Sequence, residues 1–218
     1  MNAETPKYIA VEGAIGAGKT TLAKMLAAKL NARLILEQFE DNPFLGKFYE
    51  DRRKYAFQTQ MFFLVNRYKQ LLELQQDDLF TEYIVSDYIF EKDRLFAELN
   101  LSADELQIYN SLFPILKKNI RRPDLVIFLH SSTDRLEKNI VQRSREVEKS
   151  LKRDYLDSLS QVYSDYFFKE ESGRLLIVDS SNFDFVSNRK DFEDLLTEIF
   201  REDSALVEYY TPKMNKLL

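Results

Sequence analysis

The hydrophobic pattern along the chain predicts short buried strands that alternate with longer helices. Five runs rich in Ile, Val and Leu have apolar residues at consecutive positions, as is typical of strands covered on both faces. These runs span residues 8–13, 33–38, 82–87, 124–130 and 174–180. Segments with helical spacing of apolar residues span 18–30, 53–76, 88–99, 102–120, 132–142, 150–170 and 188–201.

This alternation favours an α/β fold with a five-stranded parallel sheet flanked by helices, because parallel neighbours need helical crossovers between them. The stretch "SADE" at 102–105 has the Ser-x-x-Glu form of a capping box and marks one helix start. Residues 203–218 are expected to form an extended tail packed on the domain, although the sequence does not decide their structure.

Composition is consistent with one soluble domain spanning residues 1–218, with 44% hydrophobic and 31% charged residues. No apolar run approaches the length of a membrane span, and the N-terminus lacks a secretory layout, so a cytoplasmic location is expected. The absence of cysteine excludes disulfides and thiol catalysis. A single histidine, His130, argues against a histidine metal cluster or a Ser-His-Asp triad.

The net charge of −5 argues against a nucleic-acid partner, because proteins that bind nucleic acid usually have a basic bias. Any phosphate that the chain binds is therefore expected to be small and held locally. A cytoplasmic enzyme or binding domain is the simplest class.

Residues 13–20 carry the strongest chemical signal in the chain. They form a complete Gly-x-x-x-x-Gly-Lys-Thr phosphate loop between a predicted strand and a predicted helix. Glycines allow positive φ angles, so the backbone N–H groups can surround phosphate oxygens. Lys19 is expected to reach the β- and γ-phosphates, and the Thr20 hydroxyl to ligate Mg²⁺. The predicted ATP-binding residues of this loop are Gly13, Ala14, Ile15, Gly16, Ala17, Gly18, Lys19, Thr20 and Thr21.

The phosphate loop alone does not say whether the phosphoryl group passes to water or to an acceptor. The chain is short and shows neither a second glycine-rich switch signature nor a long regulatory region. These features favour a small kinase over a GTPase.

Several segments, taken in order, resemble the deoxynucleoside kinase family, including bacterial deoxyadenosine and deoxyguanosine kinase-like members. They are "EGAIGAGKTT", Glu37 after the second strand, "NPFLGKFYED", "FQTQMFFLVNR", "RSREVE" and "VDSSNFDF". The resemblance runs along nearly the whole chain. It implies a P-loop kinase fold with a short helical lid at about 142–150, Mg²⁺ with ATP as phosphate donor, and a homodimer formed through long helices.

In the family that this chain resembles, the glutamate equivalent to Glu37 receives the 5′-hydroxyl proton of the nucleoside. Its place at a strand end suits this role, because the carboxyl ends of strands line the ligand crevice of open α/β sheets. Gln38 stands where the family commonly has proline. By the same resemblance, Tyr49 and Glu148 hold the sugar 3′-hydroxyl in a pocket that disfavours a 2′-hydroxyl.

Gln60 and Arg67 lie seven residues apart and therefore on one helical face. The resemblance assigns Gln60 paired hydrogen bonds to the base and gives Arg67 a part in base selection. Gln58, turned by about 200°, would face away. Phe96 resembles the family's base-stacking phenylalanine.

The resemblance places Arg143 and Arg145 in the lid, where their guanidinium groups supply positive charge to the transferring phosphate. Closure of the lid would also exclude water. Residues 178–185 resemble the loop that borders the ATP adenine, which assigns Asp184 and Phe185 to the ATP site, largely through backbone contacts.

The sequence departs from the family pattern after the third strand. Ser86 and Asp87 stand where an acid followed by arginine is common, and Lys92 stands where an acidic base-reading residue often lies. Asp87 is expected to serve Mg²⁺ directly or through water. Lys92, Arg94 or the lid would have to replace the missing arginine.

The sequence therefore predicts a deoxynucleoside 5′-kinase that uses small-molecule substrates, with a weak preference for purines and for deoxyadenosine. One alternative is a nucleoside monophosphate kinase of the thymidylate type, although that family prefers aspartate where Ile15 stands, and Glu37 would repel a dianionic acceptor. Another is a nucleotide-binding regulator that has lost catalysis. The choice between ATP and GTP as donor stays open.

Overall fold

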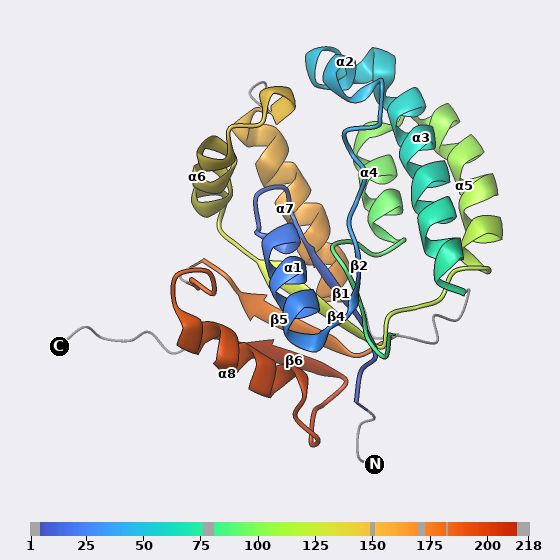
Figure 1. Ribbon diagram of the computed structural model, residues 1–218. Coiled ribbons are helices and arrows are strands. Elements are labelled where there is room, and N and C mark those ends of the chain that lie inside the picture. Colours follow the sequence, from blue (N-terminus) through green and yellow to red (C-terminus); the bar gives the residue numbers. More distant parts are fainter. Residues whose placement is uncertain (1–4, 76–80, 149–150, 170–172, 182, 213–218) are drawn as a thin grey trace.

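The computed structural model describes residues 5–75, 81–148, 151–169, 173–181 and 183–212. Within these residues one six-stranded parallel sheet has the order β2-β3-β1-β4-β5-β6. Helices lie on both sides of it (Figure 1). The predicted α/β class is thus confirmed. The strands are β1 (Tyr8–Gly13), β2 (Arg33–Ile35), β3 (Ile84–Ser86), β4 (Leu125–His130), β5 (Leu175–Asp179) and β6 (Val207–Tyr210).

The central strands are largely buried because helices cover both faces. All six residues of β1 are buried. Ile9 and Val11 pack in one core cluster with side chains of α1 (Lys19–Leu30) and α8 (Arg189–Ile199), whereas Ala10 faces a second cluster with side chains of α7 (Arg153–Phe167). Residues of opposite parity therefore fill opposite layers, as the pleat requires.

Each of the seven predicted helices has a counterpart. The structure adds α2, whose six residues are too few for a periodic signal. A hydrogen bond of 2.9 Å from the Ser102 backbone N–H to Glu105 Oε2 confirms the capping box. The predicted helix ends at 76, 150 and 170 lie outside the described residues. The helices are α1 (Lys19–Leu30), α2 (Leu45–Glu50), α3 (Arg52–Leu72), α4 (Lys92–Asn100), α5 (Ala103–Lys117), α6 (Thr133–Arg143), α7 (Arg153–Phe167) and α8 (Arg189–Ile199).

The described part of the predicted tail contains the strand that raises the count from the expected five to six. β6 pairs in parallel with β5, and Val207 lies opposite Leu175. Its residues are half-buried or exposed, because the strand lies at the sheet edge. Its sequence therefore has no run of consecutive apolar residues, and for this reason the sequence analysis did not predict the strand.

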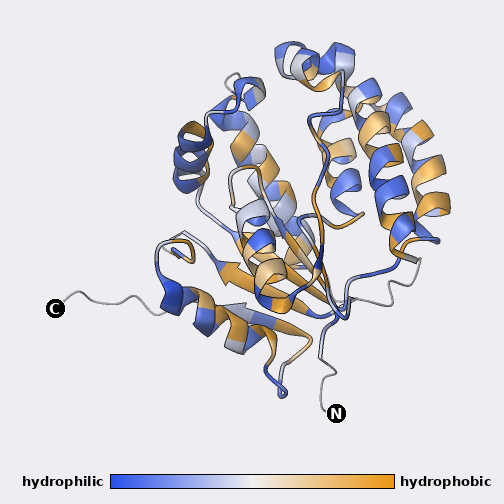
Figure 2. Cartoon of the chain, viewed as in Figure 1, coloured by the Kyte–Doolittle hydropathy of each residue, from blue (hydrophilic) through white to orange (hydrophobic). Residues whose placement is uncertain are grey.

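Three of the helices pack together beside strands β1, β2 and β3. α3, α4 and α5 pack around a cluster that includes Leu64, Tyr88 and Tyr109. Apolar colour is concentrated on the sheet and on the inward faces of the helices, with a further apolar stripe on α5 (Figure 2). Among the described residues, no helix is long and apolar enough to cross a membrane.

Candidate active site

The phosphate loop joins β1 to α1, and its backbone can be formed only with glycine at key positions. Gly13, Gly16 and Gly18 have φ angles of 154°, 89° and 96°. A Cβ atom at Gly16 would lie 2.7 Å from the Leu136 carbonyl oxygen, so steric crowding adds to the strained φ. The side-chain amide of Asn139 on α6 donates to the Gly16 carbonyl oxygen at 2.8 Å. Helix α6 therefore fixes the loop at Gly16, by close packing and by this hydrogen bond.

Lys19 begins α1 and lies along this loop. Its ammonium donates to the carbonyl oxygens of Gly13 at 2.8 Å and Ala14 at 3.0 Å. Burial, reinforced by the positive charge of Lys92, lowers the pKa of Lys19 to about 8. The ammonium is thus held beside the loop and its charge is sensitive to pH near neutrality.

The other predicted loop residues fall into two groups. Ala14 and Ala17 are buried in the core, and a backbone hydrogen bond of 3.1 Å joins them. Ile15 lines the large cavity described below, whereas Thr21 is exposed on α1. Ala14, Ala17 and Thr21 would therefore bind the phosphates of ATP through their backbone N–H groups and not through their side chains.

Asp87 connects the phosphate loop to Glu37. The Thr20 hydroxyl donates to Asp87 Oδ2 at 2.6 Å, and the Glu37 backbone N–H donates to Asp87 Oδ1 at 2.8 Å. Parallel strands β2 and β3 end at the same edge of the sheet and bring these residues together. Ser86, by contrast, is fully buried and its hydroxyl donates to the Tyr88 carbonyl oxygen at 2.8 Å, away from this group.

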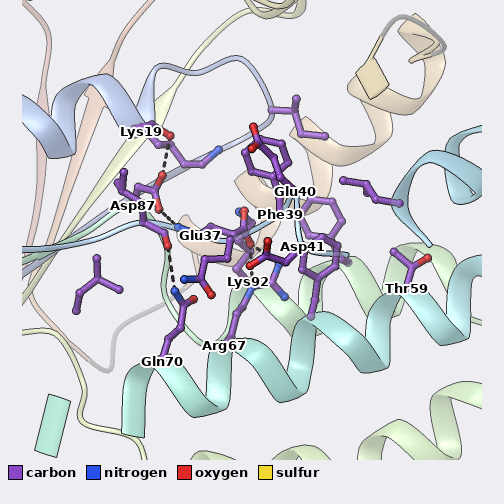
Figure 3. A pocket seen from close by; sticks show the side chains of 18 of the residues that line it. Lys19, Glu37, Phe39, Glu40, Asp41, Thr59, Arg67, Gln70, Asp87 and Lys92 are labelled. Atoms are coloured by element: carbon purple, nitrogen blue, oxygen red, sulfur yellow. Dashed lines mark hydrogen bonds and ion pairs between the residues drawn. The ribbon is translucent and has the colours of Figure 1, made fainter. Parts of the chain in front are cut away.

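Glu37 lies between two cations (Figure 3). Arg67 donates to Oε1 through its Nε at 2.9 Å and a terminal nitrogen at 2.5 Å, and the Lys92 ammonium donates to Oε2 at 2.6 Å. Burial by itself raises the pKa of Glu37, but the charges of Lys92 and Arg67 outweigh burial and hold that pKa well below its usual range. Glu37 is therefore a carboxylate over the whole physiological range of pH.

Asp93 fixes the two side chains expected to contact the base. Gln60 donates from its amide nitrogen to both the backbone oxygen of Asp93, at 2.7 Å, and its Oδ1, at 2.6 Å. Arg67 is ion-paired with Oδ2, and the Tyr109 hydroxyl donates to Oδ1 at 2.8 Å. The amide nitrogen of Gln60 is thus engaged by Asp93 and its carbonyl oxygen is left for a ligand, while the paired hydrogen bonds to a base stay a prediction.

The helical register of α3 is as predicted, since Gln60 is buried and Gln58 is exposed. Arg67 is only 3% exposed and its charge is shared between Glu37 and Asp93. Arg67 is therefore an internal ion-pair partner of the predicted base, and its expected contact with a nucleobase has no support in these bonds.

A cavity of about 670 Å³ is lined by the groups that surround Glu37. Tyr49, Phe96 and Glu148 all line it, as the sequence led us to expect. Phe96 meets Tyr163 edge-to-face, with ring centroids 6.3 Å apart. Burial raises the pKa of Tyr49 far above its ordinary value, with Tyr155 and Glu148 contributing, so its hydroxyl stays protonated. The cavity lies within the volume range of small-molecule sites.

The predicted lid contributes its two arginines to the cavity wall. Arg143 donates to both oxygens of Glu148, at 2.8 and 2.5 Å, and Arg145 lies 3.7 Å from the same carboxylate. The Arg145 guanidinium also stacks 4.2 Å from the centre of the Phe39 ring. Residues 149 and 150 of the predicted lid lie outside the described residues.

The loop after β5 approaches the phosphate loop through Phe185. A Cβ atom at Gly18 would lie 3.3 Å from the Phe185 ring. Asp184 is exposed, and its Oδ1 accepts from the backbone N–H groups of Val186 at 3.2 Å and Ser187 at 2.9 Å. Its carboxylate thus stabilises its own loop, so any contact with ATP here would come from the backbone.

The sequence analysis did not identify two side chains of the site, Asp93 and Asn139. Asp93 reads as a surface acid in an amphipathic helix, and only the folded chain reveals its three buried partners. Asn139 has no local pattern that links it to Gly16. No sequence signal known to us would have found either one.

Comparison with known proteins decides the family. A family model described as "Deoxynucleoside kinase" matches residues 9–203. The chain belongs to the deoxynucleoside kinase family. It is therefore an enzyme of phosphoryl transfer, as expected, and the family implies a phosphate donor and nucleoside or nucleotide ligands.

Two of the similar relatives within the deoxynucleoside kinase family are named for purine nucleosides. A deoxyguanosine kinase of Bacillus subtilis is 38% identical over 203 residues, which cover 89% of this chain and 97% of the relative. A deoxyadenosine kinase of Lactobacillus acidophilus is 30% identical over 208 residues, which cover 88% of this chain and 94% of the relative. A preference for purines agrees with both names, and the choice between the two purines is not settled by them.

The fold also matches a solved structure. The deoxyadenosine kinase of M. mycoides, solved with the products dCMP and dCDP, superimposes with a TM-score of 0.78. The match covers 88% of this chain and 98% of that one at 24% identity. It confirms the expected kinase fold.

Proposed function

We propose that this deoxynucleoside kinase transfers the γ-phosphoryl group of ATP to the 5′-hydroxyl of a purine deoxynucleoside, with Glu37 accepting the hydroxyl proton. The observation that carries the proposal is the position of the Glu37 carboxylate. It lies in the large cavity and is connected through Asp87 to Thr20 of the phosphate loop. A carboxylate in hydrogen-bond reach of the attacking hydroxyl is a suitable base for phosphoryl transfer.

The donor end of this reaction is assigned to the phosphate loop. Lys19 would turn its ammonium from the Gly13 and Ala14 carbonyl oxygens toward the β- and γ-phosphates. Arg143 and Arg145 would add positive charge from the lid. Their present partner, Glu148, supports this role, because one carboxylate that holds both arginines can exchange them for phosphate oxygens.

Thr20 and Asp87 would hold Mg²⁺ together with the phosphates of ATP. Their oxygens are only 2.6 Å apart, and hydroxyl and carboxylate oxygens are ligands that Mg²⁺ prefers. Among the described residues no group of three or more acidic or histidine side chains could hold a metal alone. Most of the ligands would then be phosphate oxygens and water, and the ion would neutralise charge on the transferring group.

The acceptor end is assigned to the cavity between α2, α3 and α4. Tyr49 and Glu148 would bind the sugar 3′-hydroxyl, Phe96 would stack on the base and Gln60 would accept a hydrogen bond from the base through its carbonyl oxygen. Glu148 is buried and Tyr49 is half-buried, which supports a closely fitting sugar site. The weak expectation of deoxyadenosine stays a prediction, since both purines have a named kinase among the relatives.

Glu37 also argues against the monophosphate-kinase alternative. Its low pKa keeps it anionic, and an acceptor phosphate beside it would be repelled. The hydrogen bonds that connect Thr20, Asp87 and Glu37 argue against a nucleotide-binding regulator that has lost catalysis.

Exposed apolar side chains support the expected homodimer. Ile108, Leu112 and Ile115 lie on one face of α5 at helical spacing, with exposed fractions of 53%, 38% and 61%. Val65 and Leu72 are exposed on the neighbouring α3. We assign this α3–α5 stripe to a second copy of the chain. A cytoplasmic location is proposed on the sequence grounds given above.

A panel of acceptors tests the proposed function. The chain is incubated with γ-labelled ATP, Mg²⁺ and each of eight nucleosides and their monophosphates, and labelled products are separated. Label is expected in the 5′-monophosphates of purine deoxynucleosides. Faster labelling of thymidine monophosphate than of any nucleoside would support the monophosphate-kinase alternative, and no acceptor-dependent labelling would support a regulator.

A further inference from the structure

Lys92 is a buried cation that contacts Glu37 inside the proposed acceptor site. It is the first residue of α4 and is only 5% exposed. Its ammonium lies 2.6 Å from Glu37 Oε2 and 5.9 Å above the centre of the Phe96 ring. A buried ammonium is costly to desolvate unless it is paired, so this contact fixes the place of both groups.

The other cations considered for this place are engaged elsewhere. Arg94 is exposed and its Nε lies 2.7 Å from Glu98, one turn further along α4. Arg143 and Arg145 are paired with Glu148. Arg67 does contact Glu37, but its charge is divided between Glu37 and Asp93.

We propose that Lys92 is a positioning residue, which fixes the Glu37 carboxylate for contact with the 5′-hydroxyl of the acceptor. This inference rests on the proposed function of Glu37. Lys92 occupies Oε2 and Arg67 occupies Oε1, so the carboxylate is held at both oxygens from two different helices. Oε1 accepts two hydrogen bonds from Arg67, whereas Oε2 accepts one from Lys92 and keeps a second lone pair for an acceptor hydroxyl.

Lys92 is difficult to replace because the other cation on Glu37 is shared. Arg67 contacts Glu37 Oε1 and is also ion-paired with Asp93. Lys92 is the cation that holds Oε2. Without Lys92, this oxygen would lose its ion pair and the carboxylate would be free to turn.

Four variants test this assignment. Lys92→Met removes the charge, Lys92→Gln removes it but keeps a donor, and Lys92→Arg retains it. Arg94→Met is the matched control, since it removes an exposed cation from the same helix. For Lys92→Met and Lys92→Gln, kcat at pH 7 is expected to fall on the order of 100-fold. Lys92→Arg is expected to recover most of that loss, and Arg94→Met to stay within about twofold of wild type.

The split between KM and kcat separates positioning from a general loss of structure. Loss of Lys92 is expected to lower kcat while the KM for ATP stays within about twofold of wild type, because Lys92 contacts Glu37 and not the phosphate loop. Full activity in both Lys92→Met and Lys92→Gln would overturn the assignment, as would an equal loss in Arg94→Met.

A double substitution keeps this inference separate from the proposed function. Because Lys92 acts through Glu37, adding Lys92→Met to Glu37→Gln is expected to lower kcat no more than about twofold further. A further loss as large as that of Lys92→Met alone would refute the role of Lys92. A wild-type chain that phosphorylates no nucleoside would instead refute the proposed function.

Discussion

The Thr20 hydroxyl donates a hydrogen bond to Asp87 at 2.6 Å, and the other oxygen of that carboxylate accepts from the backbone of Glu37. Thr20 belongs to the phosphate loop and Glu37 to the acceptor cavity. One side chain therefore couples the position of the proposed donor and acceptor sites. This matters because phosphoryl transfer depends mainly on the alignment and charge of the reacting groups.

Replacement of Asp87 tests this coupling. Asp87→Asn keeps the size of the side chain but removes the charge proposed to serve Mg²⁺. The Mg²⁺ concentration for half-maximal activity is expected to rise roughly 10- to 100-fold. Asp104→Asn, which removes an exposed carboxylate in the first turn of α5, is the control. Equal Mg²⁺ requirements in Asp87→Asn and wild type would contradict the proposed metal role.

Binding of ATP is expected to depend on the charge of Lys19. Its pKa of about 8 means that the ammonium loses its proton as pH rises through that value. ATP affinity should therefore fall between about pH 7 and pH 9.5. Calorimetric titration across this range measures the change, and Lys19→Arg should flatten it because arginine stays charged. A flat profile in wild type would show that Lys19 does not titrate there.

Two glycine-to-alanine substitutions test whether the phosphate loop requires glycine at position 16 for its backbone conformation. Gly16→Ala places a Cβ at positive φ and 2.7 Å from the Leu136 carbonyl oxygen. It is expected to cost about 1–3 kcal/mol of unfolding free energy and to abolish ATP binding. Gly46→Ala in α2 meets no atom within 4 Å and should be neutral or stabilising by up to about 1 kcal/mol. Denaturant unfolding compares them, and equal effects would contradict the strained geometry.

The α3–α5 stripe predicts the behaviour of the chain in solution. Ile108→Glu combined with Ile115→Glu should convert a dimer into a monomer at micromolar concentration, because two charges would be buried unpaired at the interface. Light scattering after size exclusion measures the mass. Val141→Glu, at a residue 75% exposed on α6, is the control. A wild-type monomer, or a dimer that survives the double substitution, would contradict the assignment of the α3–α5 stripe as the dimer interface.

Local patterns were sufficient to predict most of the fold and the phosphate loop. Apolar runs located β1 to β5, most clearly the central strands that helices cover on both sides, and the loop is one continuous segment with fixed backbone demands. α2 and β6 escaped because the first has six residues and the second is a partly exposed edge strand.

The charge network around Glu37 could not be predicted in the same way. Its members come from α3, α4 and the ends of β2 and β3, so only tertiary packing brings them together. The sequence analysis treats Lys92 as a departure from the family pattern, but neither its contact with Glu37 nor the buried role of Asp93 follows from spacing.

The most direct test of the central claim is the single-turnover rate of phosphoryl transfer to a purine deoxynucleoside in Glu37→Gln. With both substrates saturating, the rate is expected to fall roughly 100- to 10,000-fold relative to wild type, while ATP binding stays within about twofold. Glu50→Gln, at an exposed position on α2, should retain the wild-type rate. A Glu37→Gln rate equal to that of wild type would contradict the assignment of Glu37 as the group that accepts the proton.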